Sequence, residues 1–474
     1  MFLIYILIFS FQLYVIFSEN LFIPFKTRID LSKMTTDNAM EMLINNQITV
    51  DFLVGSNNQK IELNLKTQNA STYILSADCP ENEYAVKYNY NQSTTLVILD
   101  QNHRYYMHGF SFATHVNDKA SILLKDDKKT DINEFRFMLA TKLDYNTMQD
   151  VSGVLGLILI NDYAVTQDTD FIRQMKQKDI TNSEIFMLDY KDQYNGIFYV
   201  GDYYHEYNES YTKKDLIKIN AGRKNKYPNW EIEVNKIISG NKEIQYNTYM
   251  LLFYELGIIG APIEYYNHTK NTFFKEYLEN GVCEEKINRD NAASFQKYSY
   301  IVCNKKDFKR ESFPELKFFS SENENIYSLS HEYLFYEFND KIYFLIIHPI
   351  LSITYEYWYL GKPIFLKYKF FMDKDEKTIG FYSIIEEDKK EDGEKKQDEG
   401  GDDEGKKGGE KGENNKLVYI IIIAVLVLII IGISTYFIRR IIKSRKKRAN
   451  ELDDDDMDYT PYKQEKNDIE EGIN

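Results

Sequence analysis

Apolar and polar residues alternate over two stretches in the first part of the chain. The apolar positions are Ile48, Val50, Phe52 and Val54 in the first stretch and Ile61, Leu63 and Leu65 in the second. A period of two is typical of strands that bury one face. Residues 55–58, between the two stretches, read Gly-Ser-Asn-Asn, which is a turn sequence. The pattern therefore predicts a β-hairpin over residues 48–65.

Several later stretches have the same strand-like character. They are short, rich in aromatic and β-branched residues, and bounded by polar turns. We expect strands at 185–188, 196–202, 230–234, 326–333, 370–373 and 378–381, and a helix at 171–178. The composition agrees, because the 474 residues include 39 Tyr and 30 Phe but only 8 Pro. These features predict a large, mainly β-structured body.

Apolar runs of different kinds lie near the two ends of the chain. Residues 1–18 are apolar, end in a small residue and precede Glu19, which is typical of a secretory signal peptide. The alternative is an uncleaved anchor, because the run has no basic residue at its start. Residues 417–438 form an unbroken apolar run that is long enough for one transmembrane helix.

Charges beside the second apolar run predict how the chain is oriented in a membrane. Residues 439–448 carry seven basic groups, and such a flank remains on the cytoplasmic side. We therefore expect a single-pass type I membrane protein at the cell surface or in the secretory pathway, with residues 19–416 luminal or extracellular. Residues 386–416 are charged and Gly-rich, without apolar residues, and should form a disordered linker. Residues 439–474 would then be a cytoplasmic basic flank followed by an acidic tail.

Charge and cysteine content exclude several classes of function. The formal net charge is −15 and no basic surface stands out in the luminal part, so we expect no nucleic-acid partner. Cys283 and Cys303 should close one disulfide in an oxidising lumen, which leaves Cys79 buried or available for an intermolecular bond. His331 and Glu332 lack the second His of a zincin helix. We expect no metal and no cofactor.

The stretch 358–381 carries the most specific pattern in the chain. It has an aromatic-x-Leu-Gly entry at 358–361 and an apolar strand with an aromatic end at 364–368. After Asp373 and a charged turn, an Ile-Gly-Phe exit follows at 379–381. This pattern resembles the C-terminal signature of pepsin-like aspartic peptidases.

Other landmarks of that family follow in the family's order. The hairpin at 48–65 resembles the family's first hairpin, and Asp150–Leu157 resembles the strand behind its first catalytic loop. The resemblance implies a mainly all-β, bilobal fold around a long cleft, with an N-lobe at 48–200 and a C-lobe at 201–385. It also implies that Phe112 lies in the flap over that cleft.

The segment before the first hairpin, residues 19–47, has two interpretations. Residues 22–33 fit an edge strand of a sheet. They also resemble the start of the inhibitory prosegment in pepsin-like zymogens, an apolar-Pro-apolar strand followed by basic residues. The segment is short for a prosegment, so we interpret it as a candidate prosegment remnant.

The residues that perform the chemistry in this family are missing here. Aspartic peptidases need two carboxylates that share one proton, and each comes from an Asp-Thr/Ser-Gly loop. The first loop reads Lys-Thr-Gln, with Lys66 in the place of the Asp. For the second loop, counting back from Pro262 places Phe253 at the Asp position, whereas keeping the loop's glycine places Glu255 there. We favour Glu255.

The loss of the acid pair does not depend on the alignment, because no Asp occurs at 52–77 or at 216–289. A Lys cannot share a proton with a carboxylate as a second acid does, and it forms an ion pair instead. We therefore expect Lys66 and Glu255 to face each other across the lobe junction. The alternative is that Lys66 extends to solvent and Glu255 lies on the surface.

Glycosylation sequons are consistent with a luminal glycoprotein. The four sequons begin at Asn69, Asn91, Asn208 and Asn267. Asn69 follows Lys66 within the first loop, where a glycan would crowd the cleft. The alternative is that this sequon is half-buried and unused.

These features predict a membrane-tethered, pepsin-like aspartic peptidase homologue without proteolytic activity. We expect its luminal domain to bind a peptide or protein partner. One alternative is an active aspartic endopeptidase with unusual catalytic residues. A second alternative is an unrelated β-rich adhesion or receptor ectodomain.

Overall fold

The computed structural model describes residues 20–382, without 70, 81–84, 104–109, 144–151, 160–167, 207, 209, 223–228, 246, 289–296, 321–325 and 351–356. The described residues belong to one compact unit, residues 1–386. The predicted signal peptide, linker, transmembrane helix and cytoplasmic tail lie outside the described residues, so they stay predictions. Within the described residues, no helix is long and apolar enough to span a bilayer.

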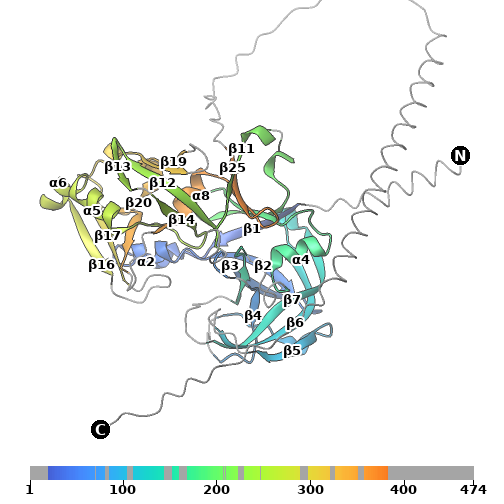
Figure 1. The fold of residues 1–474 in the computed structure, drawn as a ribbon. Coiled ribbons are helices and arrows are strands. Elements are labelled where there is room, and N and C mark those ends of the chain that lie inside the picture. The colour runs from blue at the N-terminus through green and yellow to red at the C-terminus, as the bar shows by residue number, and fades with distance from the viewer. Residues whose placement is uncertain are drawn as a thin grey trace, which may run out of the picture. The chain divides into compact units, whose positions relative to one another are not determined.

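The larger of two sheets contains most strands of the N-terminal half (Figure 1). Its order is β11 (Leu216–Asn220), β25 (Thr378–Tyr382), β24 (Phe370–Asp373), β9 (Ile185–Tyr190), β10 (Asn195–Gly201), β1 (Leu21–Thr27), β2 (Ile48–Val54), β3 (Gln59–Lys66), β8 (Gly153–Gly156), β4 (Tyr73–Leu75), β7 (Lys129–Leu143), β6 (Phe110–Leu123) and β5 (Val97–His103). The predicted hairpin is β2 and β3, which pair antiparallel. The alternating apolar residues of both strands are fully buried, as their period of two requires.

The second sheet contains strands of the C-terminal half. Its order is β19 (Ile326–Leu329), β18 (Leu316–Ser320), β12 (Glu231–Ser239), β14 (Thr248–Leu252), β23 (Tyr357–Leu360), β15 (Ile259–Gly260), β22 (Ile346–Pro349), β17 (Tyr298–Asn304), β21 (Lys341–Phe344) and β20 (Phe335–Phe338), with β13 (Lys242–Gln245) on β12 and β16 (Cys283–Asn288) on β17. The structure is therefore mainly β and has two lobes, each with its own sheet. We refer to them as the N-lobe and the C-lobe.

Short helices complete the described part of the chain. They are α2 (Ala39–Ile44), α4 (Phe171–Gln177), α5 (Ile263–Asn271), α6 (Lys275–Glu279), α7 (His331–Leu334) and α8 (Lys362–Lys367). The predicted helix at 171–178 is α4, and Asp170 caps it by accepting a hydrogen bond from the Arg173 N–H.

The apolar core continues from one lobe into the other. Trp230, which precedes β12, is fully buried. Its indole N–H donates to the Leu157 carbonyl of the N-lobe at 2.7 Å, and its ring contacts Phe186 of β9 edge-on at 5.6 Å. Trp230 therefore contacts the N-lobe in two ways, through its apolar ring and through the hydrogen bond that its N–H donates.

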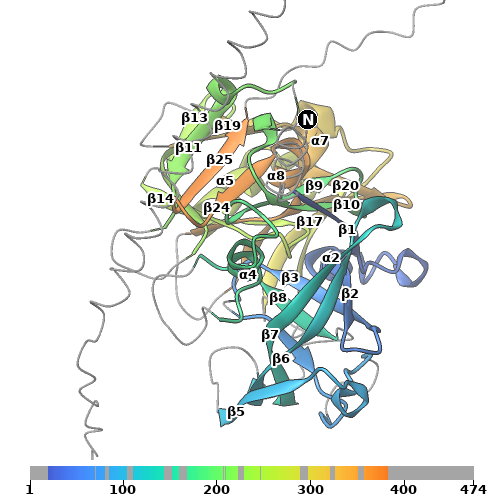
Figure 2. The same ribbon diagram turned by 90° about the vertical axis from the view of Figure 1, so that its right-hand side faces the viewer.

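The N-terminal strand differs from the prediction of an edge strand. β1 lies inside the larger sheet, between β10 and β2, and Figure 2 shows it beside β10. Pro24, which lacks an N–H, pairs with Ile197 of β10 and precedes the part of β1 that pairs with β2, so β1 is paired on one side only at this position. The alternation of buried and exposed side chains along β1 was visible in the sequence, but its two partner strands were not.

Two segments predicted as strand are partly helical. Residues 364–368 fall largely in α8, which begins directly after Gly361 and has Pro363 in its first turn. Proline favours the first turn of a helix because its missing N–H is not needed there. The predicted strand at 326–333 ends at Leu329, and α7 begins at His331.

A buried ion pair connects α4 to the turn between β24 and β25. The Lys374 ammonium contacts the Asp170 carboxylate, and both side chains are nearly inaccessible to solvent. The Lys374 backbone N–H also donates to the Glu184 carbonyl. Two buried charges are tolerated because each neutralises the other.

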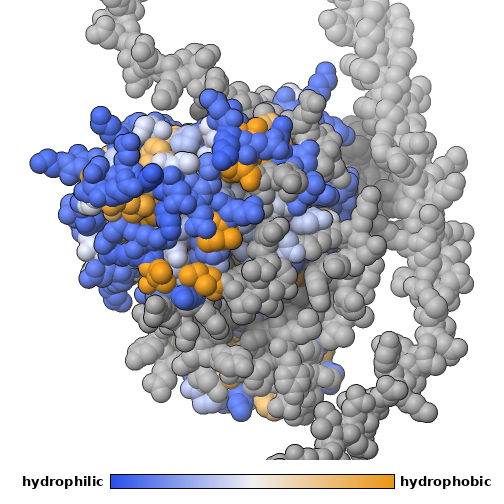
Figure 3. Space-filling view, turned by 60° about the vertical axis from the view of Figure 1, so that its left-hand side comes forward, coloured by the Kyte–Doolittle hydropathy of each residue, from blue (hydrophilic) through white to orange (hydrophobic). Residues whose placement is uncertain are grey.

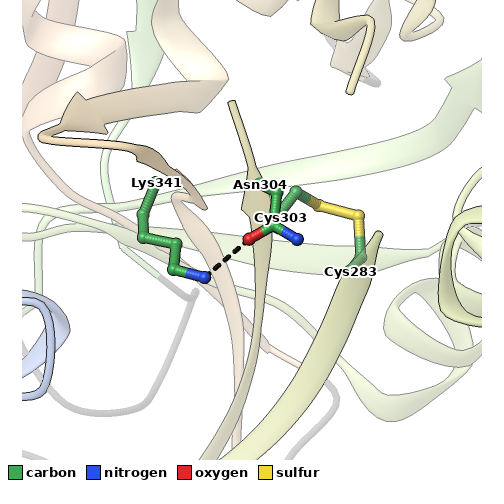
Figure 4. Close-up of a disulfide and its surroundings, with 4 residues drawn as sticks. All are labelled: Cys283, Cys303, Asn304 and Lys341. Atoms are coloured by element: carbon green, nitrogen blue, oxygen red, sulfur yellow. Dashed lines mark hydrogen bonds between the residues drawn. A yellow bond between two sulfur atoms is a disulfide. The ribbon is translucent and has the colours of Figure 1, made fainter. Parts of the chain in front are cut away.

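The structure joins Cys283 and Cys303 in a disulfide between facing positions of β16 and β17. Figure 4 shows the bond and, beside it, the Lys341 ammonium of β21 donating to the Asn304 side-chain oxygen at 2.6 Å. These contacts hold three neighbouring strands of the C-lobe together. Cys79 is buried.

Candidate functional site at the lobe junction

The first loop begins where β3 ends. Lys66 pairs with Gly156 of the parallel strand β8, and the Lys66 carbonyl accepts the Leu157 N–H at 2.9 Å. A Cβ added to Gly156 would lie 2.7 Å from the backbone of Asn69 and of Ser71. Only glycine therefore allows the loop to pack against this strand.

The second loop begins where β14 ends. Leu252 pairs with Leu360 of the parallel strand β23, and the Phe253 N–H donates to the Leu360 carbonyl at 2.9 Å. A Cβ added to Gly361 would collide with the carbonyls of Leu256 and Ile258. The two loops therefore share one backbone plan, by which we mean that the backbone of each loop packs against a glycine of the neighbouring parallel strand.

This shared plan fixes the register of the second loop. The carbonyls that approach the N-lobe glycine belong to residues three and five positions after Lys66. The carbonyls that approach the C-lobe glycine belong to residues three and five positions after Phe253. Phe253 is thus the equivalent of Lys66, and Glu255 is the equivalent of Gln68. The sequence favoured Glu255 because Gly257 follows it, but the strand pairing selects Phe253.

Glu255 nevertheless lies at the junction and contacts the first loop. Its carboxylate accepts hydrogen bonds from the Thr67 hydroxyl at 2.8 Å and from the Thr67 N–H at 3.4 Å. Thr67 is fully buried, and Glu255 is 7% exposed. The hydroxyl supplies the polar partner that a buried carboxylate needs.

The expected ion pair between Lys66 and Glu255 is not formed. In the described part of the chain, no carboxylate lies within 4.0 Å of the Lys66 ammonium. Lys66 is half-buried and Glu255 is buried. The alternative was also wrong for Glu255, which is not on the surface. The carboxylate is held by the neighbour of Lys66 instead.

A second lysine lies beneath the junction. Lys362 follows Gly361, is 6% exposed, and its backbone N–H donates to the Leu256 carbonyl of the second loop. Its ammonium donates to the Gln193 carbonyl and lies 5.4 Å from the centre of the Tyr194 ring. Burial lowers the pKa of Lys362 to about 8, and the Asp192 carboxylate opposes this shift.

Tyr190 connects the junction to the N-terminal segment. Its hydroxyl accepts a hydrogen bond from the Asn46 side-chain amide at 3.4 Å. Burial raises the pKa of Tyr190, the Asn46 hydrogen bond lowers it, and the Glu255 carboxylate raises it further. The hydroxyl therefore stays protonated and neutral at physiological pH.

The N-terminal segment also packs on the second loop. A Cβ added to Gly257 would collide with the Leu43 carbonyl of α2, and the Tyr343 hydroxyl donates to the Thr36 carbonyl at 2.8 Å. Buried apolar residues of this segment, of the second loop and of the C-lobe sheet form one cluster: Met34, Ala39, Met40, Leu43, Ile44, Leu256, Ile258, Tyr298, Tyr300, Val302, Tyr343, Leu345 and Ile347. The segment is therefore an integral part of the body.

The arrangement does not provide a pair of acids. Lys66 and Phe253 occupy the two positions whose carboxylates would share a proton, and neither side chain can act as a carboxylic acid or carboxylate. Glu255 is a single carboxylate that already accepts two hydrogen bonds. No cluster of metal-ligating side chains occurs among the described residues.

Comparison with known families supports what the geometry indicates. A family model described as eukaryotic aspartyl protease matches residues 48–384, which is more than half of the chain. The chain belongs to this family. The match spans both lobes of this aspartyl protease homologue and both loops at their junction. An unrelated β-rich ectodomain is therefore excluded as its fold.

Solved structures support the same fold. The crystal structure of basic 7S globulin from soybean is similar with a TM-score of 0.56 and 11% identity, over 77% of this chain and 95% of that chain. At this identity the likeness shows the fold and carries no function. No curated protein matches this chain.

The other predicted site residues lie away from the contacts described above. Phe112 is on β6 and is 36% exposed, with the Lys142 ammonium 5.9 Å from its ring centre. Residues 104–109, between β5 and β6, lie outside the described residues, so the flap assignment stays a prediction. Among the sequon residues, Asn91 is exposed, whereas Asn69, Asn208 and Asn267 are half-buried.

Three residues of the junction were not recognised from the sequence as part of a site: Asn46, Tyr190 and Lys362. A signal for Lys362 was present, because it is a lone cation inside the apolar stretch from Trp358 to Leu366. Nothing local to Asn46 or Tyr190 marked them, since they are 144 residues apart.

The first prediction concerns the bond between the two loops. Thr67→Val keeps the shape of the side chain but removes the hydroxyl that Glu255 accepts, so a buried carboxylate loses its best donor. We expect the free energy of unfolding to fall by about 1–3 kcal/mol, measured by urea denaturation. The double variant Thr67→Val/Glu255→Leu should recover part of this loss, because both partners are then apolar. A double variant that is destabilised by the sum of the two single effects would contradict the bond.

The second prediction concerns Lys362. Its folded pKa, about 8, lies below its ordinary value of 10.5, so between these pH values the unfolded chain binds a proton that the folded chain releases. Stability therefore rises with pH in this window. Relative to Lys362→Met, the free energy of unfolding of the natural chain should increase between pH 8 and 10 by about 2 kcal/mol.

Lys369→Met is the matched control for this pH dependence. Burial alone would lower the pKa of Lys369, but the Asp189 carboxylate together with Tyr204 and Tyr211 offsets burial and raises the pKa above its ordinary value. Both folded and unfolded chains then keep this proton up to about pH 10. The difference between Lys369→Met and the natural chain should stay constant from pH 8 to 10. Parallel curves for Lys362→Met as well would contradict the assignment.

Proposed function

We propose that this protein is a non-proteolytic member of its family that binds a peptide or protein partner at the lobe junction. The observation that carries the proposal is the identity of the two equivalent loop residues, Lys66 and Phe253. Without two acids at these positions, no water can be activated by one carboxylate while the other protonates the scissile carbonyl. The two-lobed scaffold is kept nonetheless.

The retained backbone plan supports a binding role. Both loops are still packed on their glycines, Gly156 and Gly361, and are joined by a buried hydrogen bond. Lys66 and Phe253 are only half-buried, so the junction presents a cation and an aromatic ring on rigid supports. Preorganised groups of this kind lower the entropic cost of binding.

The molecular surface does not favour another docking site on the face that Figure 3 shows. There the described residues are mainly hydrophilic, and apolar residues form separate small groups. A large contiguous apolar patch would instead mark a protein interface. The lobe junction therefore remains the better supported site.

The third prediction tests the absence of proteolysis. We expect the full-length chain in detergent micelles to leave denatured casein intact between pH 3 and 7, because Lys66 and Phe253 stand at the two equivalent loop positions. Cleavage is followed by gel electrophoresis and mass spectrometry, with and without pepstatin, and with pepsin as the positive control.

Pepstatin-sensitive fragments from the natural chain would overturn the proposal and support the alternative of an active endopeptidase. Glu255→Gln shows whether Glu255 is then responsible, because it removes the carboxylate that accepts from Thr67. A contaminating peptidase would be unaffected by this substitution.

We also propose that residues 417–438 hold the protein in a membrane with its folded body on the luminal side. The support is the length of this apolar run and the basic residues at 439–448. The fourth prediction is that the full-length chain, expressed in cells, remains in the membrane pellet after alkaline carbonate extraction. A chain without residues 417–438 should be released, and release of the full-length chain would contradict the tether.

A further inference from the structure

We infer that the partner presents a carboxylate to Lys66, next to an apolar side chain that contacts Phe253. This inference rests on the proposed peptide-binding function and specifies the chemistry of the ligand. It would make the junction selective for an extended peptide with an acidic residue beside an apolar one.

The first step is the charge of Lys66. Within the described residues it makes no ion pair, although it is half-buried. Lys60, on the same strand β3, is 61% exposed and pairs with Asp51 at 2.9 Å. A half-buried lysine that has no ion pair among the described residues is a favourable position for an anion, because ligand binding supplies the opposite charge.

The second step is that two carboxylates of this region have other partners, and neither forms an ion pair with Lys66. Glu255 is bonded to Thr67. Asp192 accepts the N–H groups of Tyr194 and Asn195. Both acids are already engaged by donors of their own.

The third step is the positive charge beneath the junction. Lys362 is bonded to the Gln193 carbonyl, and its backbone N–H is bonded to the Leu256 carbonyl of the second loop. It is too buried to meet a ligand directly, at 6% exposed. Its charge nevertheless adds a positive potential below the second loop, where buried charges are weakly screened.

The fourth step is the apolar neighbour. Phe253 holds the C-lobe position that corresponds to Lys66, and its ring lies 5.6 Å from the ring of Tyr359. The Thr67–Glu255 bond brings the two loops together one residue after Lys66 and two residues after Phe253. A short peptide segment can therefore reach both side chains.

The fifth prediction is a preference for acidic peptides. The probes are two fluorescein-labelled pools of acetylated heptapeptides with Asp or Asn at the centre and random Ala, Val, Leu and Phe on both sides. We expect the full-length chain in detergent micelles to bind the Asp pool roughly tenfold more tightly, as one charge-assisted hydrogen bond provides. Binding is measured by fluorescence anisotropy at pH 7.

Three variants show whether Lys66 causes the preference. Lys66→Gln should remove it and Lys66→Glu should reverse it. Lys60→Gln is the matched control from the same strand and should keep the preference. The thermal unfolding midpoint of each variant verifies that it is folded.

The outcomes distinguish a failure of this inference from a failure of the proposed peptide-binding function. Equal binding of both pools, or a preference that survives Lys66→Gln, overturns the inference and leaves peptide binding in place. A preference that Lys60→Gln also abolishes shows a general charge effect and overturns the inference as well. Binding of neither pool counts against both the inference and the proposed peptide-binding function.

Discussion

The hydrogen bond between the Thr67 hydroxyl and the Glu255 carboxylate is the contact on which the junction of the two lobes depends. Both groups are buried, and a buried carboxylate is stable only with a polar partner. The bond is also asymmetric. Thr67 corresponds to Tyr254 in the second loop, but the Tyr254 hydroxyl donates to the Phe370 carbonyl, away from the first loop. The two loops thus have the same backbone arrangement, but the Glu255 carboxylate connects them in one direction only, by accepting from Thr67.

Backbone and side chains have separate roles at this junction. Gly156 and Gly361 are required by the loops that pack against them, so their replacement would disturb the fold. The side chains of Lys66 and Phe253 are half-buried and are not required by the strand pairing. Catalysis constrains such positions and folding does not, so they can change when the function changes.

The N-terminal segment contributes to both lobes. β1 pairs with β10 and β2 inside the larger sheet, and the residues after it pack their apolar side chains against the C-lobe. The buried pair of Asp170 and Lys374 adds a further connection between α4 and the last strands. Removing Asp170 or Lys374 alone would leave an uncompensated buried charge, so the two residues depend on each other.

The sequence by itself determined the strands whose pattern is local, the family signature at 358–381, and the absence of Asp from residues 52–77 and 216–289. Alternation in β2 and β3 and the turn between them were sufficient, because hydrophobic period and turn chemistry act over a few residues. The sequence could not place β1 inside the sheet, because this position depends on partner strands far along the chain.

Only the tertiary structure decided what occupies the junction. The sequence offered two registers for the second loop, and the pairing of β14 with β23 selected Phe253. The tertiary structure also shows that Glu255 contacts Thr67, which is 188 residues away, and not Lys66. Which side chains meet across two lobes depends on the packing of both sheets, and no local property of the chain encodes it.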